Sequence, residues 1–463
     1  MKVKTIPSTW ITAEGRRLDC GPFMSGALEA RMVLSQLTQR KDRLREVTQN
    51  GIDGIVNAGR VKRLWVDNPQ HGIPFLSSSD ILQADLSTAP LISNKVVADY
   101  PQLVIRQGWT LITRSGTIGR MVYARPDMDG MGCSEHVMRV IADPAHIPPG
   151  YLYAFLSSKY GVPMIVGGTY GSIIQSIEPH HIADLPVPRL GEAVEQRAHA
   201  LVEEAADARS KASNLRRSAI KEFEQLFGFQ EQFPTQITAF FVTSVSSNAV
   251  RRLDANHFNP ASMKATELLA NAGKHQTILG DICDVFSTNI FKRIHVEDPA
   301  YGYAYFSGSE LFQIAPTPRG YLSRKAPGIR EYVVYTDWLL IQDAGQLGGL
   351  IGQLTRVPAN LNGVVVSNHL MRVVPRSRID AGYLFAVLSS PLGYRAITRN
   401  AFGSSIPQLD PAHISTIKIP WPDDIEREKL AAPVLNSWDL DDRATNAELE
   451  AVTLVERTIE GFA

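Results

Sequence analysis

Residues 61–77, VKRLWVDNPQHGIPFLS, align without a gap with residues 291–307, FKRIHVEDPAYGYAYFS. Three further pairs of similar segments occur in the same order around them: RRLD at 16–19 and 251–254, GYLYAFLSS at 150–158 with GYLFAVLSS at 382–390, and YGSII at 170–174 with FGSSI at 402–406. A repeat this long far exceeds the roughly 20–50 residues of a solenoid unit. Each copy is therefore expected to be a domain with its own core.

The composition is that of an ordinary globular chain of 463 residues, with 44% hydrophobic and 20% charged residues. Lys plus Arg and Asp plus Glu number 47 each, so no overall positive charge indicates a nucleic-acid partner. The acidic residues are, however, concentrated in places such as 191–207. Cys20, Cys133 and Cys283 lack the spacing of metal ligands and are expected to be reduced thiols.

No segment reaches the roughly 18 consecutive apolar residues that a membrane helix needs. The amino-terminal sequence MKVKTIPSTW also lacks a long apolar run. The sequence therefore predicts a cytoplasmic protein without a membrane partner.

The two copies share predicted strands but differ in the loops that follow them. Residues 108–114, GWTLITR, and 337–343, DWLLIQD, are expected to be buried strands. The loop RSGTIGR at 114–120 becomes the longer DAGQLGGLIGQ at 343–353, and a cation is replaced by an acid. A shared scaffold with divergent loops is typical of two binding modules with different targets. A DNA duplex with two half-sites is the partner that this duplication favours.

A long helix with an apolar seam is predicted after each copy. The apolar positions alternate in steps of four and three, as in a coiled coil. In the first helix they are Val194, Ala198, Leu201, Ala205, Ala208, Ala212 and Leu215, and in the second Leu440, Ala444, Ala447, Ala451 and Leu454. Pro433 is expected to break or begin the second helix. We expect the two helices to pair with each other; the alternative is that each packs only on its own domain.

Motifs for catalysis are few. Asn259-Pro260-Ala261 stops short of the Asn/Asp-Pro-Pro-aromatic motif of an amino-methyltransferase, and the glycines at 345–352 lack the Lys-Ser/Thr of a phosphate-binding loop. The acidic residues at 423–428 faintly resemble a nuclease metal cluster, but such residues also favour a helix amino terminus. The sequence therefore predicts no catalytic and no metal site.

His136 and His369 occupy matched positions in the motifs SEHVMR and SNHLMR. Either could be a general base only with a partner that the sequence does not identify. A structural histidine that bonds to backbone is the preferred interpretation.

Basic and polar residues in the loops fit recognition better than catalysis. Cationic side chains neutralise phosphates, arginine can bind a guanine edge, and Ser and Gln supply neutral hydrogen bonds. The candidate DNA-binding residues of the first copy are Lys62, Arg63, Arg114, Ser115, Thr117, Arg120, Tyr170, Ser172 and Gln175. Those of the second copy are Lys292, Arg293, Gln346, Ser404, Ser405 and Gln408. The alternatives are a solvated surface for the cations and a fold-closing turn for the Gly-Ser segments.

An apolar strand leads into ITRSGTIG and is followed by YLYAFLSS, GSII and LPVP, with Glu195-Gln196-Arg197 in the helix after them. This order, duplicated over nearly the whole chain, resembles the specificity (S) subunit of type I restriction-modification systems. The second copy departs from it, because its exit continues as PWPD at 420–423 with IERE at 425–428 in place of a clean Glu-Gln, and Asp343 stands where the first copy has Arg114. These departures put equal partner docking of the two helices in doubt and suggest unlike half-sites.

The resemblance implies an α+β fold with two similar target-recognition domains, separated by long helices that pair as an antiparallel coiled coil in a pseudo-twofold arrangement. The corresponding boundaries are residues 1–188 and 236–420 for the domains and 189–235 and 421–463 for the conserved helices.

The resemblance also implies a non-catalytic subunit without a cofactor of its own. Its partners would be double-stranded DNA with a bipartite site, two methyltransferase subunits that hold S-adenosylmethionine, and restriction subunits. The alternatives are an adaptor of another methyltransferase-based phage-defence system, a self-contained DNA-modifying enzyme and a protein scaffold that binds no DNA.

Overall fold

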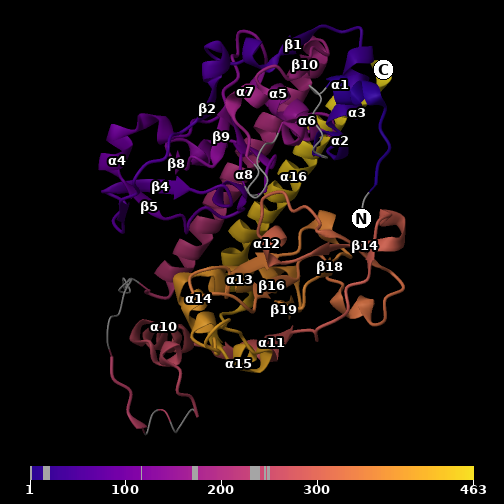
Figure 1. Ribbon diagram of the computed structural model, residues 1–463. Coiled ribbons are helices and arrows are strands. Elements are labelled where there is room, and N and C mark those ends of the chain that lie inside the picture. Colours follow the sequence, from indigo (N-terminus) through magenta and orange to yellow (C-terminus); the bar gives the residue numbers. More distant parts are fainter. Residues whose placement is uncertain are drawn as a thin grey trace. The chain divides into compact units, whose positions relative to one another are not determined.

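The computed structural model describes residues 3–13, 21–115, 117–168, 176–229, 240–244, 247 and 251–462. The chain divides into two compact units (Figure 1). Unit 1 comprises Met1–Ser210 and Arg443–Ala463, and unit 2 comprises Lys211–Asp442.

Unit 1 combines short strands with short helices. Its strands are β1 (Lys41–Arg43), β2 (Ile55–Asn57), β3 (Trp65–Val66), β4 (Gly72–Leu76), β5 (Leu91–Ser93), β6 (Thr110–Thr113), β7 (Met121–Tyr123), β8 (Gly132–Cys133), β9 (Val137–Val140) and β10 (Pro186–Pro188). Its short helices are α1 (Ser8–Ala13), α2 (Gly21–Met24), α3 (Ala27–Gln36), α4 (Asn94–Asp99), α5 (Pro149–Leu156), α6 (Gly161–Gly167) and α7 (Pro179–Ile182). The 3-10 helices are η1 (Leu44–Glu46), η2 (Gly51–Gly54), η3 (Asp80–Leu82), η4 (Pro101–Leu103) and η5 (Pro126–Met128).

Unit 2 has a similar set of elements. Its strands are β11 (Gln276–Ile278), β12 (Cys283–Phe286), β13 (His295–Val296), β14 (Gly302–Phe306), β15 (Gly320–Ser323), β16 (Leu339–Gln342), β17 (Leu354–Arg356), β18 (Val365–Val366), β19 (Leu370–Pro375) and β20 (Lys418–Pro420). Its short helices are α10 (Pro260–Ala270), α11 (Leu279–Ile282), α12 (Gly308–Leu311), α13 (Arg378–Ser389), α14 (Pro391–Thr398) and α15 (Pro411–Ser415). The 3-10 helices are η6 (Ala255–Phe258), η7 (Pro299–Tyr301), η8 (Ile329–Tyr332) and η9 (Ala359–Leu361).

The strand order is the same in both units. A four-stranded antiparallel sheet, called here the core sheet, has the order β2-β9-β6-β7 in unit 1 and β12-β19-β16-β17 in unit 2. A second four-stranded sheet has the order β3-β5-β4-β8 or β13-β15-β14-β18, with one parallel pair, β4 with β8 or β14 with β18. A two-stranded pair, β1-β10 or β11-β20, completes each set.

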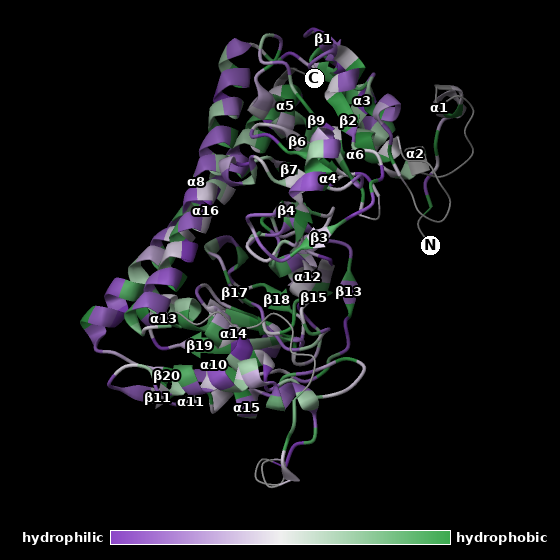
Figure 2. Cartoon of the chain, turned by 90° about the vertical axis from the view of Figure 1, so that its left-hand side faces the viewer, coloured by the Kyte–Doolittle hydropathy of each residue, from purple (hydrophilic) through white to green (hydrophobic). Residues whose placement is uncertain are grey.

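The central strands of the core sheets are covered on both faces. In β6 and β16 every residue is buried. In unit 2, Leu339 and Ile341 belong to one hydrophobic cluster while Leu340 between them belongs to another. Successive strand residues point to opposite faces, so a continuous apolar run is stable only with a core on each side. In Figure 2, the core-sheet strand β19 accordingly carries mainly hydrophobic colour.

The duplicated GYL motif explains how a short helix packs on each long helix. A Cβ at Gly150 would lie 2.8 Å from His199 Nδ1, and a Cβ at Gly382 would lie 2.9 Å from Leu435 Cδ2. Only glycine allows this approach. The following tyrosine also has the same role in both units, because the Tyr151 hydroxyl bonds to the Pro188 carbonyl and the Tyr383 hydroxyl donates to the Pro420 carbonyl at 2.6 Å.

The two long helices are α8 (Glu192–Leu226) and α16 (Asp424–Phe462), and each contributes one half to each unit. In unit 1, Arg197 bonds to Glu450 at 2.7 Å and Arg443 lies 2.6 Å from Glu204. The partner numbers fall along α16 as they rise along α8, so these halves are antiparallel. In unit 2, Arg216 pairs with Asp441 and Glu222 pairs with Lys429, so the halves of α8 and α16 in this unit are antiparallel as well.

Most of the predicted seam is buried. The buried members are Ala198, Leu201, Ala205, Ala208, Ala212, Ala444, Ala447 and Ala451, and the half-buried ones are Val194, Leu215, Leu440 and Leu454. Figure 2 shows hydrophilic and hydrophobic residues alternating along α8. Small alanine side chains leave room for the close approach of a neighbouring helix.

The prediction for Pro433 was wrong, because α16 starts at Asp424 and continues through the proline. Proline removes one backbone hydrogen bond and crowds the preceding turn. On both sides of it Leu430, Ala431 and Val434 are buried in the largest core of unit 2. Their burial keeps the segment helical despite the lost hydrogen bond.

None of the helices among the described residues is long and apolar enough to cross a membrane.

Candidate nucleic-acid interface

One end of each core sheet carries the loops that the sequence singled out. In unit 1, Arg114 N–H donates to the His136 carbonyl at 3.0 Å and Ile177 N–H donates to the Arg114 carbonyl at 3.1 Å. We call this region the loop edge. In unit 1 it comprises residues 57–60, 114–115, 134–136 and 176–178, and in unit 2 residues 287–290, 343–346, 367–369 and 402–410.

The backbone of the loop edge is the same in unit 2. Asp343 N–H donates to the His369 carbonyl at 3.0 Å, and Leu409 N–H donates to the Asp343 carbonyl at 2.7 Å. An isolated bridge joins Ala344 to Gln408, as another joins Ser115 to Ser176 in unit 1. One backbone frame therefore presents a cation, Arg114, in unit 1 and an acid, Asp343, in unit 2.

The guanidinium of Arg114 is bound within the protein. It donates to the Ile177 carbonyl at 3.0 Å and to the Glu135 carbonyl at 3.1 Å, and it forms an ion pair with Glu178. Its side chain is only 15% exposed. These contacts leave the guanidinium poorly placed for the phosphate or guanine contact that the sequence suggested.

A cavity of about 480 Å³ opens beside Arg114. Both charged and neutral groups line it: Asn57, Ala58, Gly59, Arg60, Arg114, Glu135, His136 and Glu178. Asn57 donates to Glu178 at 2.8 Å, while its Oδ1 is buried without a hydrogen-bond partner among the described residues. The cavity is therefore lined by several charged and polar residues, and one buried amide oxygen of these residues has no hydrogen-bond partner among the described residues.

The other candidates of the first loop have local partners. Ser115 Oγ lies 2.7 Å from His136 Nδ1. Thr117 is exposed, and its carbonyl accepts a hydrogen bond from the Thr113 hydroxyl. Arg120 is half-buried, and its backbone N–H donates to Thr113 Oγ1 at 3.0 Å. Ser115 thus lies at the loop edge, whereas Thr117 and Arg120 lie in the turn between β6 and β7.

In unit 2 the loop edge holds a chain of three polar groups. The Ser287 hydroxyl donates to Asp343 Oδ2 at 3.1 Å, and His369 Nδ1 lies 3.3 Å from Asp343 Oδ1. Burial raises the pKa of Asp343, although the hydrogen bonds from Ser287 and His369 and the nearby Arg372 guanidinium oppose this shift. The prediction that the matched histidines bond to backbone was wrong, because a nearby side chain occupies Nδ1 in both rings.

The duplicated Gly-Ser turn of unit 2 folds back on the loop after β16. Gln346 Nε2 donates to the Ser405 carbonyl at 2.9 Å, and Gln408 exchanges two backbone hydrogen bonds with Phe402. The side chains of Gln346, Ser404, Ser405 and Gln408 are exposed. The structure therefore brings these four predicted residues together. The matching residues Tyr170, Ser172 and Gln175 lie outside the described part of the chain.

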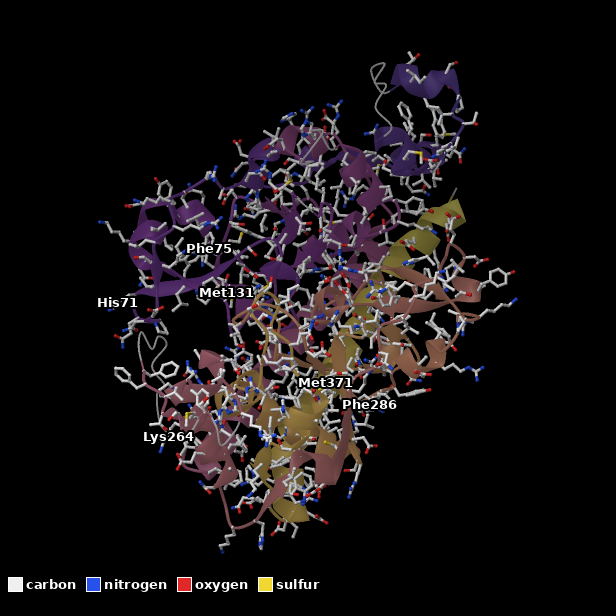
Figure 3. The ribbon with its side chains drawn as sticks, turned by 60° about the horizontal axis from the view of Figure 1, so that its bottom comes forward. His71, Phe75, Met131, Lys264, Phe286 and Met371 are labelled. Atoms are coloured by element: carbon white, nitrogen blue, oxygen red, sulfur yellow. The ribbon has the colours of Figure 1, made fainter. Side chains whose placement is uncertain are left out.

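The duplicated Lys-Arg pairs are exposed beside the second sheet of each unit. Arg63 pairs with Glu135 at 3.1 Å and lies over the ring of Phe75, which is labelled in Figure 3. The matched Arg293 instead lies over Tyr305, 5.4 Å from its ring centroid, and over Phe291. Lys62 and Lys292 are exposed.

Further cations of the same sheets were missed by the sequence analysis. Lys95 follows β5, and Arg324 and Lys325 follow β15 at the matched place. Arg324 lies 4.5 Å from the ring centroid of Tyr303. The signal was present, because Ser93-Asn-Lys95 and Ser323-Arg-Lys325 are also duplicated, and each serine accepts a hydrogen bond from the lysine N–H. Together with Lys62, Arg63, Lys292 and Arg293 they form what we call the basic rows.

The acidic residues at 423–428 start α16. Asp423 Oδ1 accepts from the Glu426 N–H at 2.9 Å, and Arg427 pairs with Asp424 at 2.5 Å. Within the described ranges, no group of three His, Cys, Asp or Glu side chains has a geometry that could hold a metal ion. Cys133 and Cys283 are buried free thiols, and Cys20 lies outside the described residues.

Comparison with known proteins gives matches among solved structures only. No protein-family model and no curated protein matches the chain. The type I restriction-modification S subunit from M. genitalium is 12% identical, with a TM-score of 0.37 over 92% of this chain and 96% of that chain. The HsdS subunit from Thermoanaerobacter tengcongensis is 16% identical, with a TM-score of 0.27 over 92% and 97%.

A third match is a chain from a structural study of complex assembly and conformational transition of the type I R-M system. It is 17% identical, with a TM-score of 0.26 over 91% of this chain and 96% of that chain. All three of these solved structures come from type I restriction-modification systems.

Proposed function

We propose that this chain is the DNA-binding specificity subunit of a type I restriction-modification complex, in which each unit reads one half of a bipartite DNA site. The observation that carries the proposal is the loop edge, which repeats one backbone frame in both units with different polar side chains. Two frames with unlike side chains suit two unlike half-sites, because base edges are distinguished by their hydrogen-bond donors and acceptors.

The basic rows supply the contacts that do not depend on base sequence. Lys62, Arg63 and Lys95 in unit 1 and Lys292, Arg293, Arg324 and Lys325 in unit 2 lie at matched places of the second sheets. Phosphate contacts of this kind fix the position of a protein on a duplex. Local clusters also explain how a chain with zero formal net charge could bind DNA.

In this proposal α8 and α16 form an antiparallel coiled coil that relates the two units by a pseudo-twofold axis. Their exposed faces recruit two methyltransferase subunits and the restriction subunits of the complex. The methyltransferase subunits bind S-adenosylmethionine and perform the chemistry, so the chain itself is not an enzyme. The complex acts in the cytoplasm.

The test is to purify the chain with candidate methyltransferase subunits and to map the methylated positions on genomic DNA. We expect methylation at one bipartite sequence, and only when this chain is present. Methylation that does not depend on the chain would overturn the proposal. Assembly with methyltransferase subunits of a system without a restriction subunit would instead identify an adaptor of another phage-defence system. Failure to bind any DNA would favour the protein scaffold.

A further inference from the structure

The imidazole of His369 is held at the loop edge with one nitrogen left for a ligand. Its side chain is 48% exposed, whereas the Asp343 side chain that it contacts is only 10% exposed. The Asp343 carboxylate can only accept hydrogen bonds when ionised, so Nδ1 must carry the proton. In the neutral ring, Nε2 is then a hydrogen-bond acceptor. No protein partner of Nε2 exists among the described residues.

The carboxylate is itself fixed by the surrounding backbone and side chains. Ser287 donates to Oδ2, and the backbone of Asp343 is hydrogen-bonded to His369 on one side and to Leu409 on the other. His369 N–H also donates to Ser367 Oγ at 3.2 Å. These contacts fix the backbone of His369 and the carboxylate that Nδ1 faces, and with it the tautomer of the ring, before any ligand binds.

The matched histidine of unit 1 has a different environment. His136 Nδ1 lies 2.7 Å from Ser115 Oγ, and its Nε2 lies 3.6 Å from Glu135 Oε1. Both nitrogens therefore face groups of the protein, although the ring is 51% exposed. His136 offers a ligand no free acceptor and serves as the internal control for His369.

A catalytic interpretation of Ser287, Asp343 and His369 does not fit their order. In a nucleophilic site the base accepts the proton of the hydroxyl. Here the Ser287 hydroxyl donates to the carboxylate, and the imidazole lies on the other side of that carboxylate. The arrangement orients an imidazole rather than activating a serine.

We propose that His369 Nε2 accepts a hydrogen bond from the exocyclic amino group of one base, adenine N6 or cytosine N4, in the half-site bound by unit 2. Asp343 is the positioning residue that fixes the ring. This inference rests on the proposed function. In the major groove only adenine and cytosine present an amino donor, so an acceptor at this place discriminates between bases. Unit 1, with Arg60 and a polar cavity at the same edge, lacks this contact.

The experiment selects binding sites from a random duplex library with the chain assembled with its methyltransferase subunits. Wild type, His369→Ala and the control His136→Ala are compared. We expect His369→Ala to lose about 5-fold to 10-fold of the preference for A or C at one position of one half-site, the effect of a single hydrogen bond. His136→Ala should leave that position unchanged.

A duplex in which the selected base is replaced by an analogue without the amino group completes the test. Wild type should bind this duplex about 5-fold to 10-fold more weakly, and His369→Ala should lose nothing further, because the two changes remove the same hydrogen bond. Independent losses from the two changes would overturn the inference, as would a preference unchanged by His369→Ala.

Two Asp343 variants distinguish a residue that positions the His369 ring from a residue that only maintains the fold. Asp343→Asn keeps an acceptor for Nδ1–H and should retain the preference, whereas Asp343→Leu should lose it as His369→Ala does. Rescue by asparagine is not expected of a residue that only maintains the fold. Equal loss in both variants would remove Asp343 from the positioning role. If wild type selects no sequence at all, the proposed function fails and this inference fails with it; selection that ignores His369 overturns the inference alone.

Discussion

Arg356 Nη1 lies 3.2 Å from Asp337 Oδ1, and this ion pair holds a residue in the left-handed backbone region. Asp337 has φ +65°, and the matched residue of unit 1 is Gly108 with φ +84°. Asp337 also pairs with Arg378 at 3.2 Å. The aspartate therefore retains a conformation that glycine adopts without strain, because its carboxylate pairs with two guanidinium groups.

Two substitutions at Asp337 should distinguish the free-energy cost of backbone strain from that of losing the ion pairs. Asp337→Ala removes the ion pairs and keeps a Cβ at positive φ, so we expect it to lower the free energy of unfolding by about 2–3 kcal/mol. Asp337→Gly should be about 1 kcal/mol less destabilising, since glycine has no such strain. Gly108→Ala is the matched control and should cost about 1 kcal/mol. Denaturant unfolding measures all three; equal values for the alanine and glycine variants would contradict the assignment of strain.

The salt dependence of DNA binding should identify the phosphate contacts. Replacing Lys292 and Arg293 with alanine should weaken binding to all sequences and lower the slope of log K against log salt by about one unit per lost contact. Arg324→Ala should do the same. Arg319, which pairs with Glu310 at 2.9 Å, is the control and should leave the slope unchanged. Unchanged slopes for all variants would show that the basic rows are a solvated surface and do not contact phosphates.

Lys62 and Arg63 allow the same measurement in unit 1. We expect a smaller effect from Arg63→Ala than from Arg293→Ala, because Arg63 already pairs with Glu135. Lys62→Ala should lower the slope by about one unit. An Arg63 effect larger than that of Arg293 would show that the ion pair opens on DNA.

Arg114→Ala is expected to act on stability. Its guanidinium donates to two carbonyls and pairs with Glu178, so its removal takes this donor from the Ile177 and Glu135 carbonyls and the paired cation from Glu178. We expect a loss of about 2–4 kcal/mol in the free energy of unfolding, measured by denaturant titration. A variant of unchanged stability with a weaker base preference in one half-site would instead show that Arg114 contacts a base.

Acid should destabilise unit 1 through Glu448. Burial raises the pKa of this carboxyl, but the Arg209 guanidinium and the Tyr153 hydroxyl outweigh burial, and the net pKa is lowered. A lowered pKa in the folded state gives stability that is present above the unfolded pKa and is lost as the pH falls through the folded pKa. Thermal unfolding at decreasing pH should therefore show a falling Tm. Glu448→Gln should lower Tm at neutral pH and flatten this acid dependence; an unaltered dependence would exclude Glu448 as its source.

The length of α8 should set the distance between half-sites if the helices act as a spacer. Inserting four residues near Ala208 adds about 6 Å of helix and turns the continuation by about 40° beyond a full turn. At about 3.4 Å per base step this length corresponds to one or two base pairs. We expect methylation mapping to find the same half-site sequences with a gap longer by one or two base pairs. An active variant with the original gap would remove the spacer role from these helices.

The sequence by itself determined the elements that depend on local pattern. The repeated segments predicted two similar sets of strands, and the four-three spacing predicted the long helices, because hydrophobic periodicity is a local property. The apolar runs at 108–114 and 337–343 likewise identified the central strands β6 and β16. The Gly-Ser turn of unit 2 and its polar side chains were also found in this way, whereas Arg324 and Lys325 were missed although their segment is duplicated.

Only the tertiary structure decided which groups of the loop edge are available to a ligand. Arg114 meets Ile177 and Glu178 across 63 and 64 residues of sequence, and His369 meets Asp343 across 26. Such partners are set by the packing of distant strands, so the sequence could not show that Arg114 is bound within the protein while His369 Nε2 has no partner in the described part of the chain. The tertiary structure also decided the conformation at Pro433, because burial against the core of unit 2, rather than local propensity, keeps α16 continuous.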